Sequence, residues 1–315
     1  MRRRHLQFHT AADPLVEAAE PWLLYPLFAA GALTVLIGEA KYAGKSTLVL
    51  NLLAQMLRRD QFAARESVAA PVVYFTEQPP TSFRQTLYQS GVLALPEELK
   101  QQFFFIHRYE AAMFSWEATV KVLAEQCDQE AAKYLVIDTF SGCVGLKGEE
   151  ENSAGGLIKE NVEYLQDAAA RQNLGVLVTH HMRKGLEPGT NLVNSSRGHS
   201  ALCDTADVIA ALRNPSNSVK HPKRTLEFAG RFADLPADPI TLTLDAGSYQ
   251  DLGSQRVLAA ADTLCAVLPE QFDAESYNAL ADALDLERDL AWSALRYLER
   301  RGAVEVLHRG EYRRH

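Results

Sequence analysis

The sequence lacks several features that would each define a class of protein. It has only four cysteines, far apart and with no C-x-x-C pair, which excludes a disulfide scaffold and a cysteine-based zinc site. Basic residues are outnumbered, 32 against 40 acidic ones, for a net charge of −8. Any contact with nucleic acid must therefore come from a local patch. Because 47% of its residues are apolar, the chain is predicted to be globular. Its four cysteines are predicted to be free thiols.

A long uninterrupted hydrophobic run is also missing. Residues 21–38 carry no charge, but Pro21, Pro26 and Gly31 interrupt them. Acidic residues separate this stretch from the basic start of the chain, whereas a signal peptide places its basic end beside the apolar run. We therefore expect a turn followed by a buried strand, no targeting segment, no membrane contact and a cytoplasmic location.

What the sequence does contain is an alternation of short β-rich runs with longer amphipathic stretches. Runs such as residues 72–75 are apolar on both faces, which is typical of strands covered by helices on each side. The alternation predicts an α/β fold with a mostly parallel sheet. The expected strands are Leu33–Ile37, Pro71–Thr76, Phe103–His107, Tyr134–Asp138 and Leu174–Thr179, and the expected helices are Lys45–Arg59, Thr81–Ser90, Trp116–Ala132 and Leu157–Gln172.

The pattern changes after about residue 205. Three further strands, joined by polar loops, are expected to extend one edge of the sheet as antiparallel additions. They are Asp207–Leu212, Arg224–Phe228 and Ile240–Leu244. The polar, glycine-bearing segment Asp245–Gly253 that follows is predicted to be a linker.

The last sixty residues turn helical, at Gln255–Val267, Glu275–Leu284 and Glu287–Arg301. Asp273 and Asp285 are expected to cap the second and third of these helices, and Gly302 to end the third. With a β-wing after it, this order predicts a small winged helix-turn-helix. We therefore predict an N-terminal arm (1–30), an α/β domain (31–250) and a winged-helix domain (254–315).

A phosphate-binding loop lies between the first long strand and the first long helix. Residues 39–46 match the phosphate-loop pattern, except that Glu39 replaces its first glycine. Backbone N–H groups and the positive end of the helix would wrap the phosphates of ATP, Lys45 would bridge the β and γ phosphates, and the Ser46 hydroxyl would ligate Mg²⁺. The predicted nucleotide-binding residues are Glu39, Ala40, Lys41, Tyr42, Ala43, Gly44, Lys45, Ser46 and Thr47.

Polar residues end three other predicted strands. The carboxyl ends of parallel strands share one edge, so Glu77, Asp138 and His180 are expected near the phosphates. Asp138 would help to hold Mg²⁺, with a helix cap as the alternative. Glu77 would polarise the attacking water, unless it is a solvent-facing loop acid. His180 would sense the γ-phosphate, with an inert strand-end histidine as the alternative.

Together these segments resemble the RecA-like P-loop ATPases, in the branch that contains the RepA and DnaB helicases. The resemblance covers about residues 20–250 and depends mainly on segments 38–47, 75–77, 135–140 and 176–184. It implies Glu77 as the catalytic base, His180 as the γ-phosphate sensor, and a homo-oligomer, as a hexameric ring or a filament, with ATP between subunits.

The resemblance also implies that an arginine from the neighbouring subunit completes the site. Arg231 falls near the family's trans-acting finger, with Arg224 and Arg197 as rivals and a surface arginine as the alternative for each. The loop after the predicted sensor carries Arg183, Lys184 and Arg197, where RecA-like motors touch DNA. A solvated loop is the alternative reading of that segment.

The C-terminal residues carry a local positive charge. From Leu286 to His315 there are seven arginines against five acids. Arg288, Trp292 and Arg296 recur every four residues on one helix face, which would enter a DNA groove, with wing arginines such as Arg309 against phosphates. Winged helices also dock proteins, and that alternative stays open.

The sequence therefore predicts a Mg-dependent, DNA-associated, oligomeric ATPase. Its finer form is a replicative helicase of a plasmid, phage or mobile element. A nucleotide-regulated DNA-binding regulator and a RecA-like autokinase are the alternatives.

Overall fold

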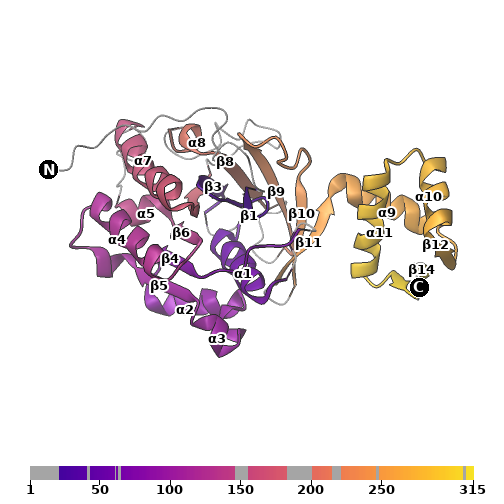
Figure 1. The fold of residues 1–315 in the computed structure, drawn as a ribbon, viewed down its shortest axis with the longest axis horizontal. Helices are drawn as coiled ribbons and strands as arrows, with labels where there is room; N and C mark the ends of the chain where they lie inside the picture. The colour runs from indigo at the N-terminus through magenta and orange to yellow at the C-terminus, as the bar shows by residue number, and fades with distance from the viewer. Residues whose placement is uncertain are drawn as a thin grey trace.

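The computed structural model describes residues 21–40, 43–60, 62, 65–145, 155–182, 201–214, 221–245, 248–307 and 310–315. Its core is a nine-stranded sheet (Figure 1). From one edge to the other the strands are β11 (Ser248–Ser254), β10 (Ile240–Asp245), β9 (Lys223–Gly230), β8 (Val208–Arg213), β3 (Ala32–Gly38), β7 (Gly175–His181), β6 (Tyr134–Asp138), β4 (Val72–Thr76) and β5 (Phe103–His107).

The strands from β8 to β5 run parallel, and β9, β10 and β11 extend the β8 edge as antiparallel strands. The prediction of a mostly parallel α/β sheet is confirmed, as are the antiparallel β9 and β10. The expectation for β8 is wrong, because this strand pairs in parallel with the central strand β3. Its first five residues are buried, as those of an inner strand must be. The sequence pattern had predicted an antiparallel strand at the edge of the sheet here.

Helices cover both faces of the sheet. On one face lie α1 (Lys45–Arg58) and α2 (Pro80–Gln89), and on the other α4 (Trp116–Gln129) and α7 (Gly155–Gln172). Side chains of β3 alternate between the two cores: Leu36 packs with the first pair of helices, and Val35 and Ile37 with the second. Short elements fill the connections: η1 (Val92–Ala94), α3 (Glu97–Lys100), η2 (Arg108–Ala111), α5 (Phe140–Val144) and α8 (Ala201–Thr205).

Part of the predicted N-terminal arm belongs to the core. Residues 1–20 lie outside the described residues, but β1 (Trp22–Leu24) and β2 (Phe28–Ala29) form a hairpin against the sheet. Leu27, in the turn between the two strands, and Phe28, the first residue of β2, are almost fully buried. The expected turn before β3 is therefore a packed hairpin. It is stabilised by burial of the apolar side chains of the uncharged stretch 21–38.

The C-terminal residues form a small separate module, which lies beside the sheet and joins it through β11 (Figure 1). It contains α9 (Gln255–Val267), β12 (Gln271–Asp273), α10 (Ala274–Ala283), α11 (Arg288–Arg300), β13 (Val304–Val306) and β14 (Glu311–Arg314). The strands form one antiparallel sheet in the order β12-β14-β13, and the helices share an apolar core of their own.

The predicted helix caps of this module are confirmed in part. The Asp273 side chain accepts a hydrogen bond from the Ser276 N–H at 2.8 Å, as an N-cap does. Gly302 follows α11 with φ +69°, which suits glycine at a helix end. The cap predicted at Asp285 is wrong: Asp285 lies in the turn with φ +54°, and Glu287 precedes α11.

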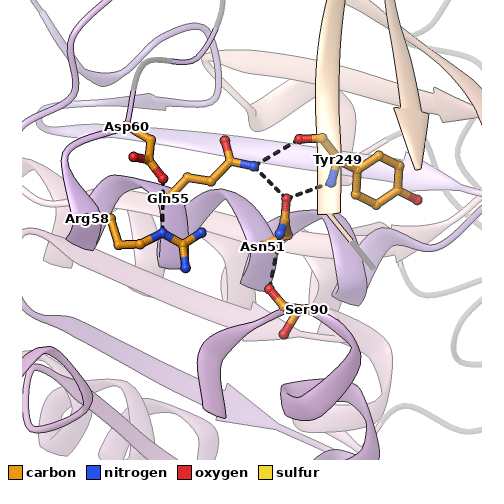
Figure 2. Close-up of polar contacts among 6 residues, drawn as sticks. All are labelled: Asn51, Gln55, Arg58, Asp60, Ser90 and Tyr249. Atoms are coloured by element: carbon orange, nitrogen blue, oxygen red, sulfur yellow. Dashed lines mark hydrogen bonds and ion pairs between the residues drawn. The ribbon is translucent and has the colours of Figure 1, made fainter. Parts of the chain in front are cut away.

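The predicted linker 245–253 is also wrong, because most of it is strand β11. Tyr249 from this strand is 1% exposed and its backbone is clamped by two side chains of α1 (Figure 2). The Asn51 Oδ1 accepts from the Tyr249 N–H at 2.9 Å, and the Gln55 amide donates to the Tyr249 carbonyl at 2.9 Å. Asn51 also donates to the Ser90 carbonyl at 3.1 Å. The antiparallel pair β10–β11 at the edge of the sheet thus holds α1, the helix that follows the phosphate loop, in position.

Replacing Asn51 by alanine should destabilise the core measurably. The buried Tyr249 N–H and the Ser90 carbonyl would both lose their partner, and each orphaned group costs about 1–3 kcal/mol. We expect the free energy of unfolding, measured by urea denaturation, to fall by about 2–4 kcal/mol. The control Gln126→Ala removes an amide hydrogen bond to Glu130, which follows the last residue of α4, and should change the free energy of unfolding by less than about 1 kcal/mol. Equal effects of the two variants would contradict this role of Asn51.

Candidate nucleotide-binding site

The phosphate loop connects the end of β3 to the start of α1. Gly44 stands at the N-cap of α1 with φ +84°, a conformation that favours glycine. The Leu48 N–H already bonds to the Gly44 carbonyl at 2.9 Å, so the N–H groups before it are left pointing out of the helix start. A helix start of this kind attracts an anion. Lys41 and Tyr42 lie outside the described residues.

Lys45 is the first residue of α1 and is buried, with 6% of its surface exposed. Its Nζ donates to the carbonyls of Gly38 at 2.8 Å and of Glu39 at 3.3 Å. Burial lowers the pKa of Lys45 to about 8, although the negative charges of Asp138, Glu39 and Glu77 act against this shift. The site therefore holds one partly desolvated positive charge among three carboxylates.

An open cavity of about 520 Å³ lies in front of the loop. It brings together most of the residues predicted from the sequence and several that were not. The side chain of Ala43 is instead fully buried in the apolar core. The cavity is lined by Glu39, Ala40, Gly44, Lys45, Ser46, Thr47, Glu77, Gln78, Ser82, Thr86, Asp138, Thr139 and His181.

Asp138 is held in place by hydroxyl groups of the neighbouring strands. Its Oδ2 accepts from the Tyr74 hydroxyl at 2.8 Å and its Oδ1 from the Thr179 hydroxyl at 2.6 Å. Gln78 contributes a longer contact of 3.4 Å to Oδ2. The sequence analysis missed these partners, although Tyr74 and Thr179 lie near the same strand ends as the acids.

The donor set suits magnesium bound together with a nucleotide. Mg²⁺ prefers oxygen ligands and usually takes one or two protein groups, with phosphates and waters completing the shell. The Ser46 hydroxyl and the Asp138 carboxylate line the same cavity. No cluster of three or more histidine, cysteine or acidic side chains that could hold a metal occurs within the described ranges. The metal roles of Ser46 and Asp138 stay predictions.

Glu77 is positioned by both its backbone and its side chain. Its N–H donates to the Asp138 carbonyl at 2.9 Å, which ties the end of β4 to the end of β6. Its Oε1 accepts from the Thr139 hydroxyl at 2.6 Å. Glu77 lines the cavity but is exposed to solvent, so its catalytic role stays a prediction beside that of a solvent-facing acid.

Of the two adjacent histidines, the structure brings His181 to the cavity. His180 is 4% exposed and its ring approaches Phe140, with the ring centroids 6.5 Å apart. Successive side chains of a strand point to opposite faces, so only one of the pair can face the loop. The sensor role predicted for His180 stays a prediction, and the geometry favours His181 for it.

The arginines predicted to act across a subunit boundary lie in different settings. Arg231 follows β9 and donates to Asp207 at 2.8 Å, at the end of β8 opposite the phosphate loop. It is 64% exposed, and its role as a finger stays a prediction. Arg224 is only 1% exposed, which removes it from the candidates. Arg183, Lys184 and Arg197 lie outside the described residues.

Arg224, in β9, instead supports the phosphate loop through a hydrogen bond to its backbone. Its Nε donates to the Ala43 carbonyl at 2.9 Å. The Tyr249 hydroxyl lies beside Gly44, 2.7 Å from the position that a Cβ atom there would take. Sequence reasoning missed both supports, because they reach the loop from strands about 180 residues or more further along the chain.

In the C-terminal module, Arg288 and Arg296 of α11 are exposed as predicted, and Arg288 lies 3.7 Å from Asp282. Trp292 does not share their face. Its Nε1 donates to Asn278 at 3.1 Å and its ring packs on Tyr277. The apolar ring is half-buried and packs on α10, so the exposed surface that Arg288 and Arg296 form is narrower than the spacing indicated. Arg309 lies outside the described residues.

The fold and site define a class of protein. A KaiC-like protein from the hyperthermophilic archaeon Pyrococcus horikoshii OT3 shares the fold, with 15% identity, a TM-score of 0.53, and coverage of 73% of this chain and 93% of that one. The RadB recombinase matches with 17% identity, a TM-score of 0.51, and coverage of 71% and 92%. The chain thus has the fold of the RecA-like P-loop ATPases.

The family is shown by sequence. A family profile described as "AAA domain" matches residues 2–187, more than half of the chain, and the protein belongs to that family. No curated protein sequence matches it. In the described part of the chain, no helix combines the length and apolar character needed to cross a membrane.

The lowered pKa of Lys45 predicts a pH-dependent nucleotide affinity. The Lys45 charge is present below about pH 8 and is lost above it, whereas bound phosphates would raise this pKa again. Affinity for a fluorescent ATP analogue should therefore be steady near pH 7 and fall by up to about tenfold per pH unit above pH 8. The control Lys45→Met should bind weakly and show no such decline. A flat wild-type profile up to pH 9.5 would contradict the assignment.

Proposed function

We propose that the protein is a Mg-dependent ATPase that assembles into an oligomer and acts on DNA. The observation that carries this proposal is the convergence of Lys45, Ser46, Glu77 and Asp138 on one cavity at the carboxyl edge of the parallel sheet. This edge is where open α/β sheets bind their ligands.

The chain's own groups divide the work of hydrolysis. The N–H groups at the start of α1 and the Lys45 ammonium bind and orient the phosphates. Ser46 and Asp138 would hold Mg²⁺, which supplies neutralisation of phosphate charge. The Glu77 carboxylate accepts a proton from the attacking water, whose oxygen forms the new bond to the γ-phosphorus while the bond to ADP breaks.

The oligomer would complete this site with a neighbour's arginine. Arg231 lies at the sheet edge opposite its own cavity and is largely exposed, so it is better placed to serve an adjacent subunit than its own. A planar guanidinium in that position would neutralise charge that develops on the transferred phosphoryl group. A hexameric ring and a filament both provide such a boundary.

Two observations support DNA as the partner. One structure with this fold is a recombinase. The C-terminal module has the element order expected of a winged helix, and its α11 exposes Arg288 and Arg296. Arg183, Lys184 and Arg197, which follow β7 in the sequence and lie outside the described residues, would add phosphate contacts in the oligomer. Replicative unwinding is the finer form of this proposal.

Two substitutions test the ATPase directly. Lys45→Ala should bind ATP only weakly, whereas Glu77→Gln should bind ATP normally but hydrolyse it about 10²–10⁴-fold more slowly. The control Glu98→Gln changes an exposed acid on α3 and should keep wild-type turnover. Turnover measured with and without DNA, beside light scattering for assembly, checks the wider proposal. A fully active Glu77→Gln variant would refute the catalytic assignment.

Neutralising the exposed face of α11 tests the DNA contact. The double variant Arg288→Ala/Arg296→Ala should weaken DNA binding and reduce the slope of log affinity against log salt by about two, since each lost phosphate contact removes about one. The control Lys121→Ala/Arg171→Ala removes the same charge from exposed positions of α4 and α7. An unchanged slope in the first variant would exclude α11 from the interface. Slow turnover with sequence-specific duplex binding would instead indicate a nucleotide-regulated DNA-binding regulator.

A further inference from the structure

The Glu77 carboxylate rests against the start of the short helix α5. A Cβ atom built on Gly142 would lie 1.3 Å from Glu77 Oε2 and 2.1 Å from its Cδ. Both distances are far shorter than any allowed contact. The carboxylate therefore occupies the space that a side chain at position 142 would take.

Conformation does not explain a glycine at this position. Gly142 lies inside α5, where any residue adopts the backbone angles and glycine is a poor helix former. It is absent from the glycines with positive φ among the described residues. A side chain at position 142 would displace the Glu77 carboxylate, which is the end of a flexible and exposed side chain.

Thr139 fixes the other side of the same carboxylate. Its hydroxyl donates to Glu77 Oε1 at 2.6 Å, a short hydrogen bond of the kind that charged acceptors form. Thr139 is 9% exposed and precedes α5 directly, so its hydroxyl is held by the same helix start as Gly142. One oxygen of Glu77 is thus hydrogen-bonded, and the other lies where a Cβ atom on Gly142 would be.

We propose that Thr139 and Gly142 are positioning residues that set the Glu77 carboxylate for hydrolysis. The inference rests on the proposed function, since it concerns the group that would activate water there. Neither residue belongs to the phosphate loop. Their loss should therefore impair turnover while leaving nucleotide affinity close to that of the wild type.

The test compares turnover and ATP affinity in four variants. A displacement of about 1 Å costs on the order of 100-fold, so Gly142→Ala should lower kcat by about 100-fold with Kd for ATP within about twofold. Thr139→Val should lower kcat by about 10–100-fold, because it loses a hydrogen bond to a charged group. Thr139→Ser keeps the hydroxyl and should restore turnover to within about threefold of wild type.

The matched control is Thr119→Val. Thr119 is buried in α4 and its hydroxyl donates to the Ser115 carbonyl at 2.9 Å, so the variant loses a similar bond without touching Glu77. It should turn over ATP at the wild-type rate. If Gly142→Ala does not fold, the comparison of Thr139→Val with Thr139→Ser tests the positioning role by itself.

The outcomes separate this inference from the proposed function. An active Glu77→Gln variant refutes the catalytic role itself. An inactive Glu77→Gln beside Gly142→Ala and Thr139→Val variants at wild-type rates refutes only the positioning role. Equal losses of turnover and ATP affinity in Thr139→Val, or failure of Thr139→Ser to restore turnover, would also overturn it.

Discussion

A buried ammonium group is the constraint on which the site depends. Lys45 is largely removed from water, and an unpartnered charge there would be costly. The carbonyls of Gly38 and Glu39 accept hydrogen bonds from it, so the end of β3, the loop and the start of α1 must keep one geometry. The acids around the cavity also stabilise the charged form of Lys45, because their negative charges raise its pKa.

That geometry is maintained by parts of the chain far away in sequence. Arg224 from β9 holds the Ala43 carbonyl, and Tyr249 from β11 lies against Gly44 while α1 clamps its backbone. The antiparallel strands are therefore more than an edge extension of a parallel sheet. They also support the phosphate loop, through the contacts of Arg224 with Ala43 and of Tyr249 with Gly44.

Much of this arrangement could be predicted from local patterns. A buried strand, a G-K-S-T segment and an amphipathic helix lie together in sequence, so the loop and the acids Glu77 and Asp138 were found. Strand β11 was missed because the segment 245–253 has the composition of a linker. The packing of Trp292 on α10 and the choice between His180 and His181 at the cavity depend on which face of each element meets its neighbour. The close approach of Glu77 to Gly142 depends on how the end of β4 meets α5. None of these is visible before the elements meet.

Strand β11 has one more consequence for the whole molecule. It ends at Ser254 and α9 begins at Gln255, with no intervening residue. A flexible tether would let the C-terminal module reorient without effect on the core. Here a rotation of α9 must be absorbed by bending at that junction or by a shift of the strand that carries Tyr249. The module and the nucleotide loop are therefore mechanically connected through the backbone itself.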